Sequence, residues 1–381
     1  MNLILRKFQE SGIGIKSDLL PPRFMFMEVN KRCNLKCTHC DFWMRNDDDR
    51  ANYLTLSQKE NIIGEFAHMS PRGSLVICGG EPMLDLEEYF GMCAAARDKG
   101  IRVLSVVNGT RIRTAEMADR MVLEGPHEIS ISLNSHDPEI HDKTRGVKGA
   151  FERAVRALRL LCEARDRNPQ AKSRIIVMGL IFKSNYKLIE EFYDFVLNDI
   201  GVNHLKLNFL QPSFGALGDV DRFFEDEGEI DQDEMMKTIN RCDKRFNLQL
   251  NPAWKQDVSM YFDSLSEIDD RINGWQSSGR TKKHICNTYD RNIMVNHYGM
   301  ARLCFASGFE GKQLEQSGDL TEFWYGAENI RRKMRKCNAF CGISHSVRKE
   351  SSTVQGRHSM DDFVAANASR RGKRPTEYQG S

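Results

Sequence analysis

The chain has 381 residues, 40% of them hydrophobic, so it can bury the core of one large or two ordinary domains. Its 55 basic and 53 acidic side chains leave a formal charge of +2, which points to neither a nucleic-acid nor a membrane partner. The sequence has no long apolar run and no secretory signal pattern, so we expect a cytoplasmic protein. In such a chain eleven cysteines favour metal ligation or buried, reduced thiols over disulfides.

The first predicted strand, residues 24–29, leads into a loop with three closely spaced cysteines, Cys33, Cys37 and Cys40. Three thiolates can converge on one soft metal centre. Because they supply three ligands rather than four, a cluster that they hold keeps one iron open. A closed zinc site with His39 as the fourth ligand is the alternative at this point.

A helix and a second strand follow the cysteine loop. Ser57 and Glu60 predict a capping box for a helix that runs to about Met69. A buried strand at 75–78 then ends in the turn Gly79-Gly80-Glu81-Pro82, whose glycines let the backbone approach a ligand closely.

The CxxxCxxC loop and the GGEP turn together resemble the radical S-adenosylmethionine (SAM) superfamily. In that family the three cysteines hold a [4Fe-4S] cluster whose open iron is chelated by SAM, and reduction of the sulfonium releases a 5′-deoxyadenosyl radical. The resemblance implies SAM contacts from Gly79, Gly80, Glu81 and Pro82, and a reducing partner such as flavodoxin or ferredoxin. Given this resemblance, a closed zinc site with His39 as the fourth ligand is the less favoured interpretation.

Strand and helix patterns continue to alternate up to residue 210. Helices are expected at about 85–99, 114–123, 149–164 and 187–199, and strands at 103–107, 128–134, 174–182 and 204–210. Six strand–helix units with continuously apolar strands predict a parallel sheet covered by helices, and they suit the partial (β/α)6 barrel of the superfamily. Residues that follow the strands are then the candidates for chemistry, because α/β barrels carry their active sites there.

Polar residues near the fourth and fifth strands are further candidates. Ser132 and Asn134 alternate on the fourth strand and can face the inside of the barrel to bond SAM, although Asn134 is as readily the cap of a turn. Arg145 precedes the helix near 150, and the resemblance favours a contact between its guanidinium and SAM. Asn185 is a weaker candidate on the same logic.

Four cysteines stand alone in the sequence. Cys78, Cys93, Cys162 and Cys242 are expected to be buried, reduced residues of the core. Cys162 or Cys242 would be a hydrogen-atom donor only if it pointed into the barrel, and Cys242 is a weak catalytic candidate on this ground.

An acidic segment, residues 223–234, follows the last barrel strand. At the mouth of the barrel it would favour cationic substrates, although a solvated loop and helix start is the commoner arrangement. Helical patterns near 231–246 and 257–275 then lead to a second set of cysteines.

A hairpin over residues 292–304, turning near Tyr298-Gly299, and a following helix can bring four thiols together. These are Cys286, Cys304, Cys337 and Cys341. Four thiolates suffice for a [4Fe-4S] cluster or a zinc site. The spacing resembles the SPASM domain in its shortened twitch form, which implies one fully ligated auxiliary [4Fe-4S] cluster.

These predictions divide the chain into a lead-in (1–20), a barrel (21–215), a helical connector (216–280), a SPASM/twitch-like domain (281–345) and a basic mobile tail (346–381). The resemblance implies a radical SAM oxidoreductase or epimerase that acts on a C–H bond of a polar small molecule such as an amino sugar or cyclitol. Maturation of a ribosomally made peptide is the alternative. A non-catalytic zinc or iron–sulfur protein is a remote one.

Overall fold

The computed structural model describes residues 19–44, 50–211, 220–266, 268–270, 276–277, 284–286, 288–305, 309–335, 337 and 346–348. Several predictions fall outside these residues. They concern most of the lead-in, Cys341, and the tail from residue 349 onwards.

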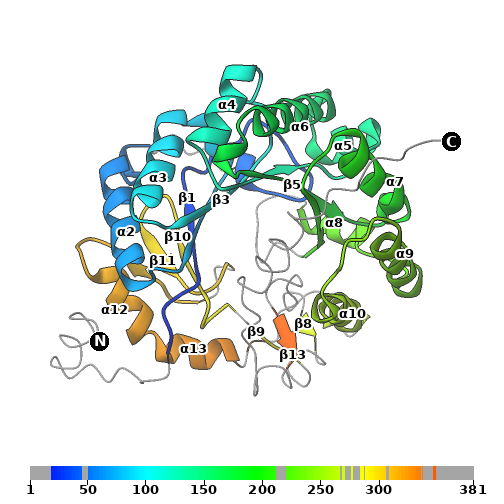
Figure 1. Ribbon diagram of the computed structural model, residues 1–381. Coiled ribbons are helices and arrows are strands. Elements are labelled where there is room, and N and C mark those ends of the chain that lie inside the picture. The colour runs from blue at the N-terminus through cyan, green and yellow to red at the C-terminus, as the bar shows by residue number, and fades with distance from the viewer. Residues whose placement is uncertain are drawn as a thin grey trace.

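Six parallel strands form the core of the fold, as the sequence predicts. Each pairs with the next in chain order, and every pairing is parallel. They are β1 (Phe24–Glu28), β2 (Ser74–Cys78), β3 (Arg102–Val107), β4 (Glu128–Ser132), β5 (Arg174–Ile181) and β6 (His204–Phe209). Figure 1 shows the sheet curving with its helices on the outside, which confirms the expected partial barrel.

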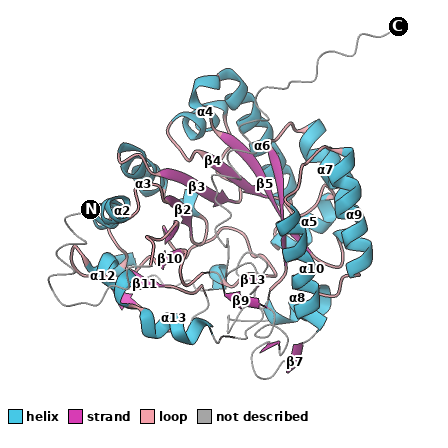
Figure 2. Ribbon diagram, turned by 60° about the horizontal axis from the view of Figure 1, so that its bottom comes forward, coloured by secondary structure: helices cyan, strands magenta, loops and turns pink. Residues whose placement is uncertain are grey.

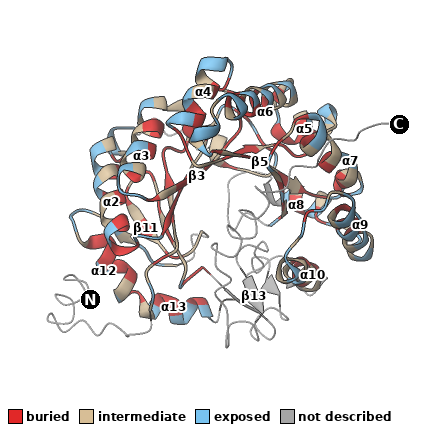
Figure 3. Ribbon diagram, in the orientation of Figure 1, coloured by how far each residue is buried: buried red, intermediate tan, exposed pale blue. Residues whose placement is uncertain are grey.

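Helices cover the convex face of this sheet. They are α2 (Leu56–Met69), α3 (Leu86–Asp98), α4 (Ala115–Leu123), α5 (Pro138–Arg145), α6 (Ala150–Arg167) and α7 (Ile189–Asp194). Apart from α5, whose buried residues include the Arg145 that contacts Cys37, their buried residues face the strands (Figure 3). Because strand side chains alternate between faces, Met25 and Met27 of β1 join this core while Phe24 and Phe26 lie on the concave face and stay partly exposed.

Helix α2 begins earlier than predicted. Its N-cap is Thr55, whose hydroxyl accepts from the backbone amide of Gln58, while the Gln58 side-chain oxygen accepts from the backbone amide of Thr55. The capping box is therefore formed by Thr55 and Gln58 and not by the predicted Ser57 and Glu60. The two patterns overlap in the sequence. The first residue of the helix that the earlier one caps, Leu56, packs against α3 at Gly91.

Helix α5 is absent from the predicted elements. Asp137 caps it, Pro138 occupies its first turn, and Gly146 ends it with a φ of 65°. It is only eight residues long, and its apolar periodicity is too short to stand out. Arg145 therefore lies on the last turn of a helix rather than in a loop.

The predicted hairpin joins the barrel sheet. Strand β10 (Asn292–Val295) pairs in parallel with β1 and antiparallel with β11 (Met300–Arg302), which pairs with β12 (Lys312–Gln313). The turn includes Gly299 at a φ of 88°, near the predicted position. Since β10 runs parallel to β1, this turn lies at the same edge of the sheet as the loop that carries Cys33.

The remaining helices lie at the two ends of the sheet (Figure 2). They are α8 (Val220–Glu227), α9 (Gln232–Arg245) and α10 (Pro252–Ser266) at the β6 end, and α12 (Asp319–Gly326) and α13 (Glu328–Arg335) at the β11 end. Helix α12 is anchored by bonds from Thr321 to Glu65 and from Trp324 to the carbonyl of Leu20. None of the described helices is both long and apolar enough to span a bilayer.

Two expectations for the second half are corrected. The helix predicted at 257–275 is α10, which ends at Ser266 and is followed by the short strands β7 (Ile268–Asp270) and β8 (Gln276–Ser277). The expected tail begins with a strand, β13 (Ser346–Arg348), which pairs with β9 (His284–Cys286).

Candidate cluster and cofactor site

The three cysteines of the first loop come together at the carboxyl end of β1. Cys37 is buried, Cys33 and Cys40 are partly exposed, and all three pack in one group with Leu35 and Ala150. Burial raises the pKa of Cys33 to about 12 and that of Cys40 to about 11, so a bound metal would have to displace their protons. Among the residues that the structure describes, no three His, Cys, Asp or Glu side chains gather around a point fit for a single metal ion.

The GGEP turn is joined to this loop through backbone contacts. The amide of Gly80 donates to the carbonyl of Asn30 at 2.9 Å, and the amide of Glu81 donates to the carbonyl of Arg32 at 2.6 Å. A Cβ on Gly80 would lie 2.0 Å from the Arg32 oxygen, and Gly79 has a φ of 127°. The two glycines are therefore required by the contact between the turn and the cysteine loop.

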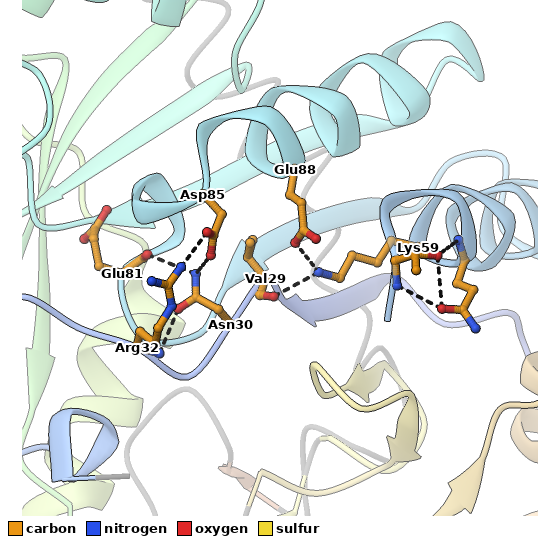
Figure 4. A network of polar contacts seen from close by, with 9 residues as sticks. Val29, Asn30, Arg32, Lys59, Glu81, Asp85 and Glu88 are labelled. Atoms are coloured by element: carbon orange, nitrogen blue, oxygen red, sulfur yellow. Dashed lines mark hydrogen bonds and ion pairs between the residues drawn. The ribbon is translucent and has the colours of Figure 1, made fainter. Parts of the chain in front are cut away.

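Side chains reinforce this junction (Figure 4). The amide of Asn30 donates to Asp85 at 2.9 Å and to the carbonyl of Glu81, and its oxygen accepts from the Arg32 amide at 2.8 Å. The Arg32 guanidinium pairs with Asp85 at 2.5 Å. We call Asn30, Arg32 and Asp85 the loop latch, because they tie the residue before Cys33 to the start of α3.

Replacing Asp85 by alanine should loosen the loop latch. Two bonds to one carboxylate would be lost, but Arg32 and Asp85 are 26% and 30% exposed, so we expect a cost of only about 1 kcal/mol. Iron should be lost to a chelator faster than from the unmodified protein, with partial rescue in Asp85→Asn. Glu124→Ala, which breaks the exposed Arg120–Glu124 pair, is the matched control. Equal rates of iron loss from all variants would show that the loop latch does not help to retain the cluster.

A buried lysine supports the same edge of β1 (Figure 4). The Nζ of Lys59, on α2, donates to the carbonyl of Val29 at 2.9 Å and pairs with Glu88 of α3 at 2.5 Å. Lys59 is fully buried, so these two contacts replace the water that its ammonium loses on folding. The end of β1 is thus tied to both helices beside it.

Glu81 uses its carboxylate within the protein. It accepts from the amides of Asn108 at 2.8 Å and Met83 at 3.1 Å, and burial raises its pKa to about 7. Pro82 is buried in the short helical turn that Glu81 caps. All four GGEP residues that the sequence marks for SAM thus have a structural use, the glycines in the contact with the cysteine loop and Glu81 and Pro82 in the turn itself.

Arg145 reaches the cysteine loop. Its Nη1 donates to the Cys37 sulfur at 3.6 Å and its Nη2 to the Asn134 oxygen at 3.1 Å. Its Nε and the Nδ1 of His39 are buried without a partner in the described part of the chain. Burial and the Arg145 charge lower the pKa of His39 to about 3, so that ring is neutral. Three thiols, a guanidinium and two orphaned nitrogens fit an anionic iron–sulfur cluster with a polar ligand.

Asn134 and Asn185 hold this arrangement in place. The Asn134 side chain donates to Thr144 and accepts from Arg145 and from the amide of Leu180, while Asn185 donates to the Asn134 carbonyl at 2.7 Å. The side-chain amides of Asn134 and Asn185 are therefore both hydrogen-bonded within the protein, and together they position Arg145. Ser132 ends β4 on the concave face and is partly exposed.

The lone cysteines mostly lie in the core. Cys93 and Cys242 are fully buried and Cys162 is 5% exposed, as expected. Cys242 lies on α9, which packs against α7 outside the barrel, so its weak candidacy as a hydrogen donor is wrong. Cys78 differs from the expectation, because it is only partly buried.

The second cysteine set is described only in part. Cys304 follows β11 and Cys337 follows α13, and both are partly exposed. Cys286 ends β9, where the structure describes the backbone, and Cys341 lies outside the described residues. Their common ligation stays a prediction.

A buried Glu28–His297 pair escaped the sequence analysis. The Nδ1 of His297 lies 2.7 Å from a carboxylate oxygen of Glu28, and both side chains are at most 10% exposed. The two residues are 269 positions apart, and nothing local in the sequence relates them. Only the parallel pairing of β10 with β1 brings them together.

Comparison with known proteins locates the similarity in the barrel. The model of the Radical SAM superfamily matches residues 27–196. The chain is 32% identical over 143 residues to the AdoMet-dependent heme synthase of Methanosarcina barkeri, covering 38% of this chain and 40% of that protein. It is 33% identical over 143 residues to the mycofactocin maturase MftC of Mycolicibacterium smegmatis, covering 38% of this chain and 35% of MftC. The matched region thus spans well under half the length of either relative.

The fold has a counterpart among solved structures. The crystal structure of Streptococcus suis SuiB bound to precursor peptide SuiA aligns with a TM-score of 0.61 at 15% identity, covering 87% of this chain and 70% of SuiB. At this identity the likeness is one of fold, and it extends well beyond the region that the sequence comparisons match.

Proposed function

We propose that this chain, whose residues 27–196 match the model of the Radical SAM superfamily, reductively cleaves SAM and takes a hydrogen atom from a substrate C–H bond. The observation that carries the proposal is the junction between the cysteine loop and the GGEP turn. Two functional motifs about forty residues apart meet there through backbone bonds at 2.9 and 2.6 Å.

Each residue of the site has a definite task in this proposal. Cys33, Cys37 and Cys40 would hold a [4Fe-4S] cluster, which, when bound, supplies a single electron and an open iron for the amino and carboxylate groups of SAM. Arg145 offers an N–H to the Cys37 sulfur and a positive charge beside it. Backbone carbonyls of the turn at Gly79 and Gly80 would accept from the SAM ammonium, and Ser132 would face the ribose.

Anaerobic reconstitution with iron and sulfide tests the proposal. The protein should then form 5′-deoxyadenosine and methionine from SAM when dithionite is added, as measured by mass spectrometry. A preparation with its iron bound that forms neither product would contradict the assignment.

The substrate that we favour is a polar small molecule such as an amino sugar or cyclitol, which would be oxidised or epimerised. Polar groups occupy the concave face, since Lys206 and Asn208 alternate with buried leucines on β6. Lys206 and Ser132 are both register partners of Met178, so they lie at the same level of the sheet. The acidic segment adds little preference for cations, because Glu229 and Glu234 pair with Lys183 and Lys187. Hydroxyl groups, rather than the amine, would then provide most of the recognition.

Maturation of a peptide is the second candidate, and the similarity to MftC favours it. A panel of C–H-deuterated amino sugars, cyclitols and short peptides separates the two. Only a true substrate raises 5′-deoxyadenosine above the uncoupled rate and transfers its deuterium to that product. A porphyrin belongs in the panel because of the heme synthase relative.

We also propose that Cys286, Cys304, Cys337 and Cys341 share a fully ligated auxiliary [4Fe-4S] cluster. Iron analysis should then give about eight atoms per chain, falling to about four in the Cys304→Ala, Cys341→Ala double variant. The first cluster, held by other cysteines, should still cleave SAM in that variant. About four iron atoms together with one zinc in the unmodified protein would instead identify a structural zinc site.

A further inference from the structure

Cys78 and Glu28 lie side by side on the concave face of the barrel. Their Cα atoms are register partners at the ends of β2 and β1. The preceding residues, Met27 and Ile77, are buried in the core beneath the helices, so the alternation of the strands turns Glu28 and Cys78 the other way. The thiol comes directly before the Gly79-Gly80 turn, at the edge where SAM is expected.

The hairpin turn supplies a third member of this group. His297 approaches Glu28 at 2.7 Å through Nδ1, and its Nε2 is buried without a partner among the described residues. The rings of Tyr53 and Tyr298 lie 4.7 and 4.1 Å from the His297 ring and hold it in place. The group thus consists of Cys78, Glu28 and His297.

Cys78 has the properties of a hydrogen-atom donor. It is partly exposed, whereas Cys93, Cys162 and Cys242 are at most 5% exposed in the core. Burial, and next the Glu28 charge, raise the pKa of the Cys78 thiol far above its usual range, which keeps the S–H bond intact at neutral pH. A thiolate has no hydrogen atom to give.

We propose that Cys78 donates a hydrogen atom to carbon radicals formed inside the barrel and that Glu28 and His297 return its proton. This proposal rests on the proposed function and deepens it, because a thiol within the barrel makes epimerisation of the substrate possible.

The S–H bond of Cys78 breaks and a C–H bond forms on the substrate radical, which leaves a thiyl radical on Cys78. One electron from a reduced iron–sulfur or flavin protein of the ferredoxin or flavodoxin class and one proton from the Glu28–His297 pair restore the thiol. The substrate then shows no net oxidation, and each cycle consumes one SAM and two electrons.

The decisive experiment needs no substrate. Reconstituted holoenzyme is given SAM and dithionite in D2O, so that exchangeable S–H becomes S–D. In the absence of substrate, the 5′-deoxyadenosyl radical should take the nearest weak hydrogen, and the 5′-deoxyadenosine should contain solvent deuterium. Cys78→Ser is close in size but offers only a strong O–H bond, so the label should fall to background. Cys242→Ser, in the core, should keep it.

A second measurement does not depend on turnover. Iodoacetamide treatment of the folded protein, followed by peptide mass spectrometry, should modify Cys78 slowly, because alkylation needs the thiolate, but faster than the core residues Cys93 and Cys242, and S-adenosylhomocysteine should slow it further. Glu28→Gln should speed the modification, because the neighbouring negative charge no longer disfavours the thiolate.

These outcomes distinguish a failure of hydrogen donation by Cys78 from a failure of SAM cleavage. Unlabelled 5′-deoxyadenosine from the unmodified protein, or equal labelling in Cys78→Ser, would overturn the role of Cys78 and leave SAM cleavage standing. No 5′-deoxyadenosine from any iron-loaded protein would overturn both.

Discussion

Replacing Cys37 by alanine is expected to abolish 5′-deoxyadenosine formation altogether. Cys37 is the buried member of the three thiols, and its sulfur accepts the bond from Arg145, so its loss would remove one of the three proposed cluster ligands and leave the guanidinium without this acceptor. A site with only three thiolates cannot lose one and keep an iron corner available for SAM. The measurement is 5′-deoxyadenosine per chain after anaerobic reconstitution, together with iron content.

Cys162→Ala is the matched control for Cys37→Ala. It removes a thiol of similar burial from α6, so the two variants share the cost of a small cavity in the core. We expect the control to keep both iron and activity. SAM cleavage that persisted in Cys37→Ala with full iron content would refute the ligand assignment.

Replacing Gly80 by valine should have the second largest effect. The new Cβ would meet the Arg32 carbonyl at 2.0 Å, and backbone atoms on both sides of the contact cannot move aside cheaply. The turn must therefore separate from the cysteine loop and break the amide bonds to Asn30 and Arg32. We expect SAM affinity, measured by calorimetry, to fall by about tenfold or more, which corresponds to at least about 1.4 kcal/mol.

The Gly80 prediction can be separated from a general loss of stability. Gly326→Ala, at the exposed end of α12, places its Cβ in open space and should be neutral or stabilising by about 0.5 kcal/mol. Thermal unfolding of both variants shows whether the whole fold responds. Unchanged SAM affinity in a folded Gly80→Val protein would mean that the junction is not needed for SAM binding.

The amino-acid sequence by itself determined the class of the fold and the centre of the site. Alternating apolar segments marked six strands and most of the helices, because the periods of 3.6 and 2 residues are local properties. The spacing of Cys33, Cys37 and Cys40, with the glycine turn one helix later, was enough to predict the resemblance to the radical SAM superfamily, whose model matches residues 27–196. The hairpin at Tyr298-Gly299 was also within reach, since its glycine is a local requirement of the turn.

The tertiary structure decided what each polar group faces. Gly80 lies against the carbonyl of Arg32, 48 positions away, and the Asn134 side chain accepts from Arg145 and Leu180. Cys242 and Cys78 looked alike as lone cysteines, yet one is buried under α7 and the other ends a strand on the concave face.

Register is the physical reason for this division. The pairing of β1 with β2 sets the side that Cys78 faces, and the pairing of β1 with β10 brings His297 to Glu28 across 269 residues. Pairing between distant strands is fixed by which apolar faces can be buried together, and a shift of one residue would turn every side chain to the opposite face. Such contacts have no local pattern, so only the folded chain reveals them.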